Sequence, residues 1–204
     1  KTPPPLFWKR LIMLWWARKL YRLVMGSLFP LIYFIWPSRI PVLSVLLFFF
    51  LWALAGEITR RKYPRVWKAI LRTKLFGAIF KSKAGMLLGS TYFLLACIIV
   101  VAAFPRSISL TSMAYLVLGD AASTLVGQRY GSIELFSGKS FQGTLAFLTI
   151  CCLVGWLLHF PLGLSVSQFL AGAVAAAFIE LLPLPLDDNF TIALFSSLVM
   201  RLIA

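Results

Sequence analysis

The chain has 204 residues, of which 61% are hydrophobic, and a formal net charge of +14. Its mean hydropathy of +0.92 excludes a water-soluble globule, because too few polar residues remain to cover the surface of one. The positive charge is spread over segments between apolar runs, and this distribution argues against nucleic acid as a partner. The sequence therefore predicts an integral membrane protein.

Seven apolar runs follow one another along the chain. Each has close to the roughly 20 residues that a helix needs to cross a bilayer. Because strict two-residue alternation is absent, the runs predict helices and not the strands of a barrel. We expect an all-α, polytopic helical bundle that forms one domain over residues 1–204. The predicted spans are Leu20–Trp36, Pro41–Gly56, Gly85–Phe104, Leu110–Val126, Phe141–Phe160, Ser165–Leu182 and Phe190–Ala204.

The charged residues predict the orientation of the bundle. Residues 1–19 mix tryptophan with lysine and arginine, which is typical of a helix lying in the membrane interface. Basic residues also gather in 57–84 and recur in 127–140, so we expect these segments to be cytoplasmic. Positive-inside topology and attraction to anionic lipids explain most of the charge in 57–84. The six acids, Glu57, Asp120, Glu134, Glu180, Asp187 and Asp188, all fall near the predicted cytoplasmic ends, which favours a shared polar site there.

Asp120 is the strongest candidate for a functional residue. It lies inside the fourth predicted span, where a charge is costly and usually faces a cavity. The small residues around it, Gly119 and Ala121 to Ser123, favour the close approach of a helix or a ligand. A buried structural ion pair is the alternative interpretation.

The segment 127–140 predicts a phosphate-binding loop. Gly127, Gly131 and Gly138 are able to adopt positive φ and expose backbone N–H groups. Lys139 and Ser140 follow at the start of the fifth span, where the helix dipole favours an anion. The alternative is an ordinary tight loop. The motif is not a P-loop, because Ile133 stands where that motif needs glycine and a membrane helix precedes it.

The C-terminal region adds further acids. Glu180 ends the sixth span, and Asp187, Asp188 and Asn189 open the seventh. Asp188 or Asn189 is a candidate helix cap. Two adjacent carboxylates on the side of Asp120 also suit Mg²⁺, which binds through one or two carboxylates together with substrate phosphates. A metal site built on histidine is excluded, because His159 is the only histidine in the chain.

Several motifs together resemble one enzyme family. They are Gly119-Asp120 with Ser123, Gly127 and Gly131; Lys139-Ser140 with Gly143-Thr144; LPLPLDDNFTIAL near the C-terminus; GSTYFLL from Gly89; and ARKLYR, which contains Arg18 and Lys19. The pattern resembles that of the CTP-dependent lipid kinases, which comprise dolichol kinase, phytol kinase and the fungal-type diacylglycerol kinase. Arg22 stands where many members of this family have histidine, and Ser123 where they usually have alanine.

The resemblance implies transfer of a phosphoryl group from CTP, with Mg²⁺, to a lipid alcohol: a polyprenol, phytol or diacylglycerol. We assign catalysis to Asp120, Lys139, Arg18 and Lys19; nucleotide binding to Gly119, Gly127, Gly131, Gly138, Ser140 and Gly143; metal binding to Asp120, Asp187 and Asp188; and a secondary polar role to Glu57, Arg60, Glu180 and Asn189. The alternatives are a membrane CTP-dependent cytidylyltransferase and a small ion-coupled transporter that uses Asp120 as a relay.

Overall fold

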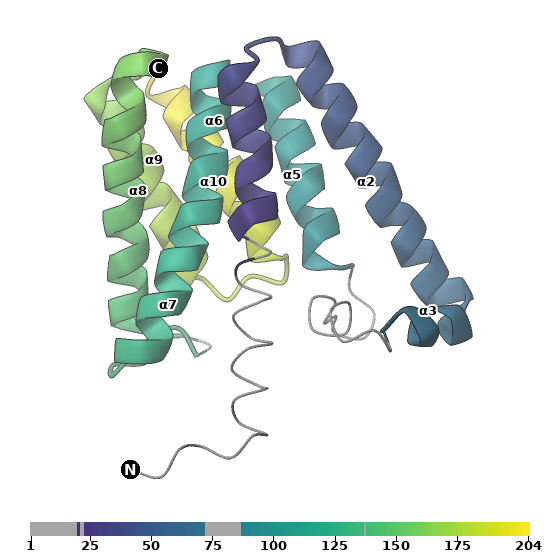
Figure 1. Ribbon diagram of the computed structural model, residues 1–204. Coiled ribbons are helices and arrows are strands. Elements are labelled where there is room, and N and C mark those ends of the chain that lie inside the picture. The colour runs from purple at the N-terminus through teal and green to yellow at the C-terminus, as the bar shows by residue number, and fades with distance from the viewer. Residues whose placement is uncertain (1–19, 21–22, 72–86, 137) are drawn as a thin grey trace.

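The computed structural model describes residues 20, 23–71, 87–136 and 138–204 (Figure 1). Within these residues the chain forms a bundle of helices without a strand; one isolated bridge pairs Glu134 with Ser140. The predicted all-α class is confirmed. The predicted interfacial segment 1–19, with Arg18 and Lys19, lies outside the described residues, as do positions 72–86.

Each predicted span contains a helix. The helices are Leu23–Ile35, α2 (Arg39–Lys62), α3 (Pro64–Leu71), α5 (Gly89–Ala103), α6 (Arg106–Ala114), the π-helix η1 (Tyr115–Gly119), α7 (Asp120–Tyr130), α8 (Phe141–Leu162), α9 (Val166–Leu181) and α10 (Asp188–Leu202). Three stretches in the described part are long and apolar enough to cross a membrane: Arg39–Lys62, Arg106–Tyr130 and Phe141–Leu162. The chain is thus a membrane helical bundle, and the number of passes stays a prediction.

Two predicted boundaries were wrong. The apolar pattern stops at Val126, yet α7 continues to Tyr130, so the predicted loop 127–140 starts too early. Gln128 and Arg129 are good helix formers, and they continue the helix although they are polar. In the same way, the second span extends beyond Gly56 through a polar turn to Lys62. Hydrophobicity marks the part of a helix that faces lipid, and a helix can continue past that part.

Polar caps define the turn between α8 and α9. Gly163 ends α8 with φ +66, a left-handed conformation that glycine adopts at low cost, and its N–H donates to His159 O. Ser165 opens α9 through a capping box, in which Gln168 N donates to Ser165 Oγ and Ser165 N donates to Gln168 Oε1. The tight turn brings α8 and α9 together as an antiparallel pair.

Two arginines donate hydrogen bonds to carbonyl groups at the C-terminal ends of helices, at the opposite end of the bundle from α3. Arg39 Nη2 donates to Phe104 O at 2.9 Å, just beyond α5. Arg106 Nη2 donates to Phe34 O at 2.7 Å, in the last turn of the helix Leu23–Ile35. The last carbonyl groups of a helix lack partners within it, and a cation there also suits the helix dipole. These two basic side chains therefore help to close the fold.

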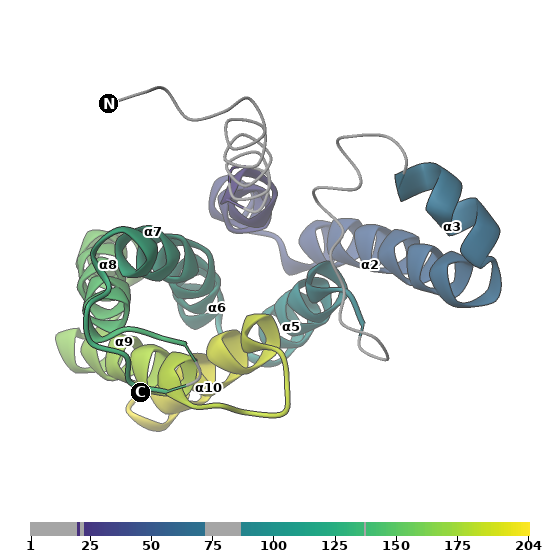
Figure 2. The same ribbon diagram turned by 90° about the horizontal axis from the view of Figure 1, so that it is seen from below.

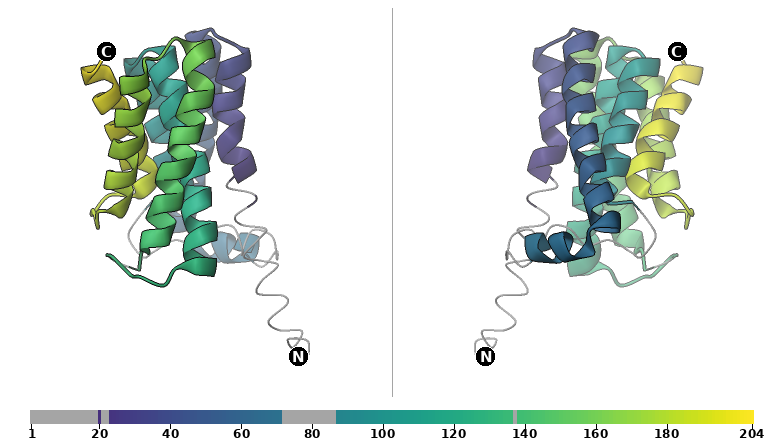
Figure 3. Two further views of the ribbon diagram at one scale, coloured as in Figure 1. Left: turned by 90° about the vertical axis from the view of Figure 1, so that its left-hand side faces the viewer. Right: turned by 90° about the vertical axis from the view of Figure 1, so that its right-hand side faces the viewer.

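The continuous helix from Arg106 to Tyr130 runs through the middle of the bundle. In α6, Ile108 to Met113 are all buried. The view along the bundle shows α6 and α7 beside α8, with α9 and α10 completing that side and α2 at the opposite edge, packed on α5 (Figure 2). The short α3 follows α2 and runs across its end (Figure 3). The helix Arg106–Tyr130 thus leads from the buried core at α6 to Asp120, which is half-buried.

The π-helix η1 immediately precedes Asp120. Tyr115 begins it and is fully buried, and its hydroxyl donates to Phe169 O on α9 at 2.8 Å. π-helical turns interrupt α-helices rarely, and often do so at functional sites. The Tyr115 contact fixes this irregular turn against a neighbouring helix. The helical face that follows, starting at Asp120, is therefore set by tertiary packing as well as by local sequence.

The close packing around Tyr115 is testable through Gly155 on α8. A Cβ at Gly155 would collide with the Tyr115 hydroxyl and lie 2.6 Å from Phe169 Cδ2, whereas one at Gly56 on α2 would meet nothing within 4 Å. We expect Gly155→Ala to destabilise the protein by about 1–3 kcal/mol through overpacking. Gly56→Ala should be neutral or stabilise by up to about 1 kcal/mol. Thermal unfolding of the full chain in detergent measures both; equal midpoints for the two variants would contradict this packing.

Candidate functional site

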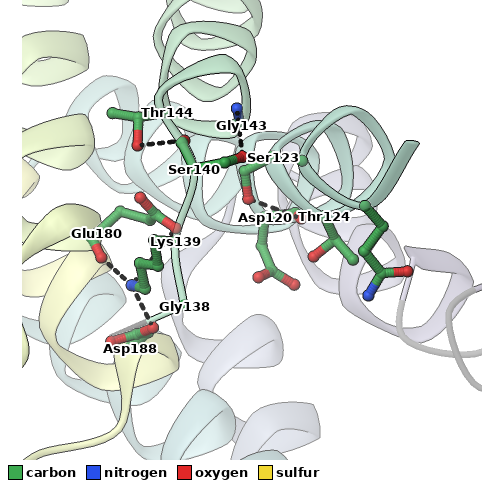
Figure 4. A pocket seen from close by; sticks show the side chains of 12 residues that line it. Asp120, Ser123, Thr124, Gly138, Lys139, Ser140, Gly143, Thr144, Glu180 and Asp188 are labelled. Atoms are coloured by element: carbon green, nitrogen blue, oxygen red, sulfur yellow. Dashed lines mark hydrogen bonds and ion pairs between the residues drawn. The ribbon is translucent and has the colours of Figure 1, made fainter. Parts of the chain in front are cut away.

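A polar pocket of about 240 Å³ lies where α7, α8, α9 and α10 meet (Figure 4). Its volume is below the usual range for sites that enclose a whole drug-sized ligand, so it suits a compact charged group. The lining residues are Asp120, Ser123, Thr124, Gly127, Gln128, Gly138, Lys139, Ser140, Gly143, Thr144, Glu180 and Asp188. Half of the sixteen residues assigned from the sequence thus converge on one pocket.

Lys139 is the cationic centre of the pocket. Its Nζ lies 2.9 Å from Asp188 Oδ2 and 3.4 Å from Glu180 Oε1, and it also donates to the main-chain oxygen of Glu180. Asp188 opens α10 and Glu180 lies in the last turn of α9. One ammonium group therefore ties the loop before α8 to two further helices.

Glu180 is the most buried acid of the pocket. Its side chain is 9% exposed, and among the described residues its Oε2 atom has no hydrogen-bond partner. The three acids of the lining, Asp120, Glu180 and Asp188, outnumber its one basic residue, Lys139. A buried carboxylate oxygen without a partner is costly. The lining therefore holds more acidic than basic side chains, and its buried Glu180 carboxylate favours a cation.

Asp120 faces the pocket from the α7 side. Figure 4 shows its carboxylate pointing into the space between Lys139 and Thr124. Thr124 and Gln128, which also line the pocket, follow at intervals of four residues and so share one helical face with Asp120. The sequence analysis did not assign these two residues. Their four-residue spacing from Asp120 is the signal by which they could have been found in the sequence.

A tight turn before α8 positions Lys139. Leu135 N donates to Lys139 O at 2.8 Å, and Lys139 N donates to Phe136 O at 2.9 Å. Gly138 has φ +78, which this turn requires and glycine tolerates. Gly127 is helical and Gly131 has φ −64, so the expectation of positive φ was wrong for both. The turn is built by its own backbone hydrogen bonds around one left-handed glycine.

The predicted cradle of free N–H groups is only partly present. The N–H groups of Lys139, Phe141 and Gly143 are bonded within the protein, to Phe136 O, Ile133 O and Ser140 Oγ. Ser140 is the N-cap of α8. The anion-attracting features of this pocket are therefore the Lys139 ammonium group and the positive end of the α8 dipole.

The glycines of α7 and α8 allow the two helices to come unusually close. A Cβ at Gly127 would lie 3.0 Å from Ser140 Oγ, and one at Gly143 would lie 3.0 Å from Ser123 O. A Cβ at Gly131 would lie 2.8 Å from Ser140 Oγ. Any larger residue would push the N-terminus of α8 away from α7. These glycines set the width of the pocket.

Some assigned residues lie elsewhere. Gly119 does not line the pocket; its Cα faces α8, where a Cβ would lie 2.7 Å from the Phe147 ring. Glu57 and Arg60 form a separate ion pair, with Arg60 Nη2 2.6 Å from Glu57 Oε2. Glu57 also accepts from Leu88 N and so holds the start of α5. The Glu57–Arg60 pair therefore links α2 to α5, outside the pocket.

Asp187 acts as a helix cap. Its Oδ1 accepts from Asn189 N at 3.0 Å and from the Asn189 side chain. The sequence analysis expected Asp188 or Asn189 in this role, and that expectation was wrong by one or two positions. Asp188, one residue further on, turns toward Lys139 instead. Adjacent residues at a helix start point in different directions, which separates the two carboxylates.

The predicted metal ligands Asp120, Asp187 and Asp188 do not form a preassembled cluster. Among the described residues, no group of three or more His, Cys, Asp or Glu side chains is arranged to hold a metal ion. Lys139 Nζ lies between Glu180 and Asp188, at the place where their oxygens converge. The acids that share the pocket are Asp120, Glu180 and Asp188.

The chain is similar to several known proteins. One is an uncharacterized protein of Rickettsia prowazekii, with 26% identity over 186 residues, which is 87% of this chain and 88% of that protein. Another is the probable phytol kinase 3, chloroplastic, of Glycine max, with 35% identity over 109 residues, or 47% of this chain and 34% of that protein. A third is the farnesol kinase, chloroplastic, of Arabidopsis thaliana, with 32% identity over 130 residues, or 55% and 42%.

The chain spans less than half the length of these plant kinases. No family model matches it, and no solved structure does. The relatives with a described activity are thus distant kinases that share part of this chain.

The capping role of Asp187 predicts a stability effect. We expect Asp187→Ala to destabilise the protein by about 1 kcal/mol, because α10 loses the acceptor for its first N–H groups. Asp187→Ser should restore most of the loss, since serine is an equally good cap. Chemical unfolding of the full chain in detergent measures both variants. Equal losses for serine and alanine would show that the carboxylate does something other than cap the helix.

Proposed function

We propose that the chain phosphorylates a membrane lipid alcohol, with a nucleoside triphosphate as the donor. The observation that carries this proposal is the pocket that joins the Asp120 carboxylate to Lys139 at the start of α8. The carboxylate is able to accept the proton of an alcohol, and the ammonium group is able to bind phosphate. The similarity to plant proteins named phytol kinase and farnesol kinase supports the same reaction.

The acceptor that we propose is a long-chain isoprenoid alcohol. Phytol and farnesol, in the names of the plant relatives, are alcohols of this class. Such a molecule lies in the bilayer with its hydroxyl group near the headgroups. Asp120 lies inside a membrane helix on the pocket wall, where it is able to meet that hydroxyl. We propose that the pocket faces the cytoplasm, from which the nucleotide enters.

The donor that we propose is CTP, on the basis of the sequence resemblance. Its phosphates would interact with Lys139, the N-terminal dipole of α8 and the hydroxyls of Ser140 and Thr144, all of which line the pocket. The volume of about 240 Å³ suits the phosphates alone. The nucleoside would then extend over the rim, near Gln128.

The pocket fits Mg²⁺ in its donor chemistry. Hard carboxylate oxygens are the ligands of this ion, which usually takes only one or two of them together with phosphate oxygens and water. A preassembled cluster of three acids is therefore unnecessary. Asp188 and Glu180 are the residues that would hold the ion, and the unpartnered Glu180 Oε2 favours a cation nearby. When bound, Mg²⁺ would neutralise charge on the phosphoryl oxygens.

In the reaction, the acceptor oxygen forms a bond to the γ-phosphorus and the bond to the bridging β-oxygen breaks. The products are a lipid monophosphate and a nucleoside diphosphate. We assign to Asp120 the acceptance of the hydroxyl proton, and to Lys139 the binding of charge on the phosphoryl oxygens. In such transfers the protein acts mainly by positioning and by electrostatic stabilisation.

The reaction itself is tested with the full chain purified in detergent. Four nucleoside triphosphates labelled in the γ-phosphate are combined with phytol, farnesol, a dolichol and diacylglycerol, with Mg²⁺ present. We expect label in the lipid monophosphate, most with CTP and an isoprenoid alcohol. Label only in pyrophosphate would indicate a cytidylyltransferase, and the absence of lipid labelling in every combination would refute the proposal.

Replacement of Asp120 tests its role. Asp120→Asn keeps the size of the side chain and removes the proton acceptor, so we expect a loss of about 10²-fold or more in kcat. Glu134 is exposed and lies outside the pocket, so Glu134→Gln is the matched control and should keep full activity. Rates are measured at saturating nucleotide, and elution from size exclusion confirms folding. A fully active Asp120→Asn protein would exclude this role.

A further inference from the structure

Lys139 and the acids of the pocket compete for the same space. Lys139 Nζ is within 2.9 Å of Asp188 Oδ2 and within 3.4 Å of Glu180 Oε1. One positive charge is therefore shared by two carboxylates that come from different helices. Asp120 adds a third acid to the same lining. The arrangement resembles a cation site in which the cation belongs to the protein.

The Glu180 carboxylate is only half satisfied by this arrangement. Oε1 lies near Lys139, but Oε2 is buried and has no hydrogen-bond partner in the described part of the chain. The Lys139 ammonium group donates to the main-chain oxygen of Glu180 and to Asp188, and its contact with Glu180 Oε1 is an ion pair of 3.4 Å. Within the described residues, one oxygen of this buried carboxylate is therefore left without a partner, and a bound cation would satisfy it.

We infer that Glu180 and Asp188 form a divalent-cation site for which the Lys139 ammonium group is the internal competitor. This inference rests on the proposed function and deepens it, since it gives Lys139 a second role at the proposed ion site. When the acids exchange Lys139 for a divalent cation, the ammonium group is released from them. It then becomes available to phosphate oxygens in the same pocket.

The effect of removing Lys139 on metal affinity distinguishes a competing lysine from one that only supports the acids. If Lys139 holds the acids in place for the metal, its removal weakens metal binding. If it competes with the metal for their oxygens, its removal strengthens metal binding, because no positive charge then has to be displaced. The two roles predict opposite signs.

Titration of Mn²⁺ into the full chain in detergent, without nucleotide, distinguishes the two signs. Mn²⁺ takes the same oxygen ligands as Mg²⁺, and electron paramagnetic resonance counts the free ion. We expect Lys139→Met to raise the Mn²⁺ affinity by about tenfold or more, because a unit positive charge is removed from the site. Glu180→Gln should lower the affinity by about tenfold or more, since a buried negative ligand is lost. Glu134→Gln, an exposed acid outside the pocket, is the control and should bind as the parent does.

Weaker or unchanged Mn²⁺ binding by Lys139→Met would overturn the competition. Unchanged Mn²⁺ binding by Glu180→Gln would overturn the assignment of Glu180 as a ligand. This second variant retains Lys139, so it tests the cation site even where Lys139→Met does not fold. The outcome is independent of the proposed reaction. Lipid phosphorylation without these Mn²⁺ effects would refute the exchange and leave the proposed kinase activity standing. The expected Mn²⁺ effects without phosphorylation by any nucleotide would support the exchange and refute the kinase activity.

Discussion

The ion pairs of Lys139 are the interaction on which the pocket depends. A single ammonium group joins the loop before α8 to the end of α9 and the start of α10. These segments are distant in sequence, and the hydrogen bonds of their own helices do not bring them together. Charges within a membrane bundle are stable only when they are paired or hydrated. Lys139 therefore both closes this end of the bundle and gathers the groups that can do chemistry.

Close helix packing then determines the relation of Asp120 to Lys139. Gly127 and Gly143 let α7 and α8 approach within a distance that a Cβ would prevent. The π-helix before Asp120 is held by the Tyr115 hydroxyl on α9. Asp120 is thus fixed by contacts on α8 and α9, and Lys139 by contacts on α9 and α10. Because α9 takes part in both, movement of this helix would change both groups together.

The sequence was sufficient to predict the membrane bundle, the order of its helices and most of the pocket. Hydrophobic runs predict helices in lipid, and a charge within such a run indicates a functional position. The directions in which the side chains point could not be predicted from the sequence. Asp187 and Asp188 are the same residue type at adjacent positions, but Asp187 caps α10 and Asp188 faces Lys139. Likewise Gly127 was predicted to be a loop glycine, but it lies in the helix α7 and packs against the start of α8.

The two buried glutamates of the described residues show why an ion pair alone does not mark a functional site. Glu57 has a partner for each oxygen: Leu88 N for Oε1, and Arg60 for Oε2. Its satisfied carboxylate has a complete structural role in joining α2 to α5. Glu180 is similarly buried, yet Oε2 is left without a partner, and the cation beside it is shared with Asp188. A fold gains nothing from an unsatisfied buried oxygen. The pocket around Glu180 is therefore better explained by a ligand that completes it than by its contribution to stability.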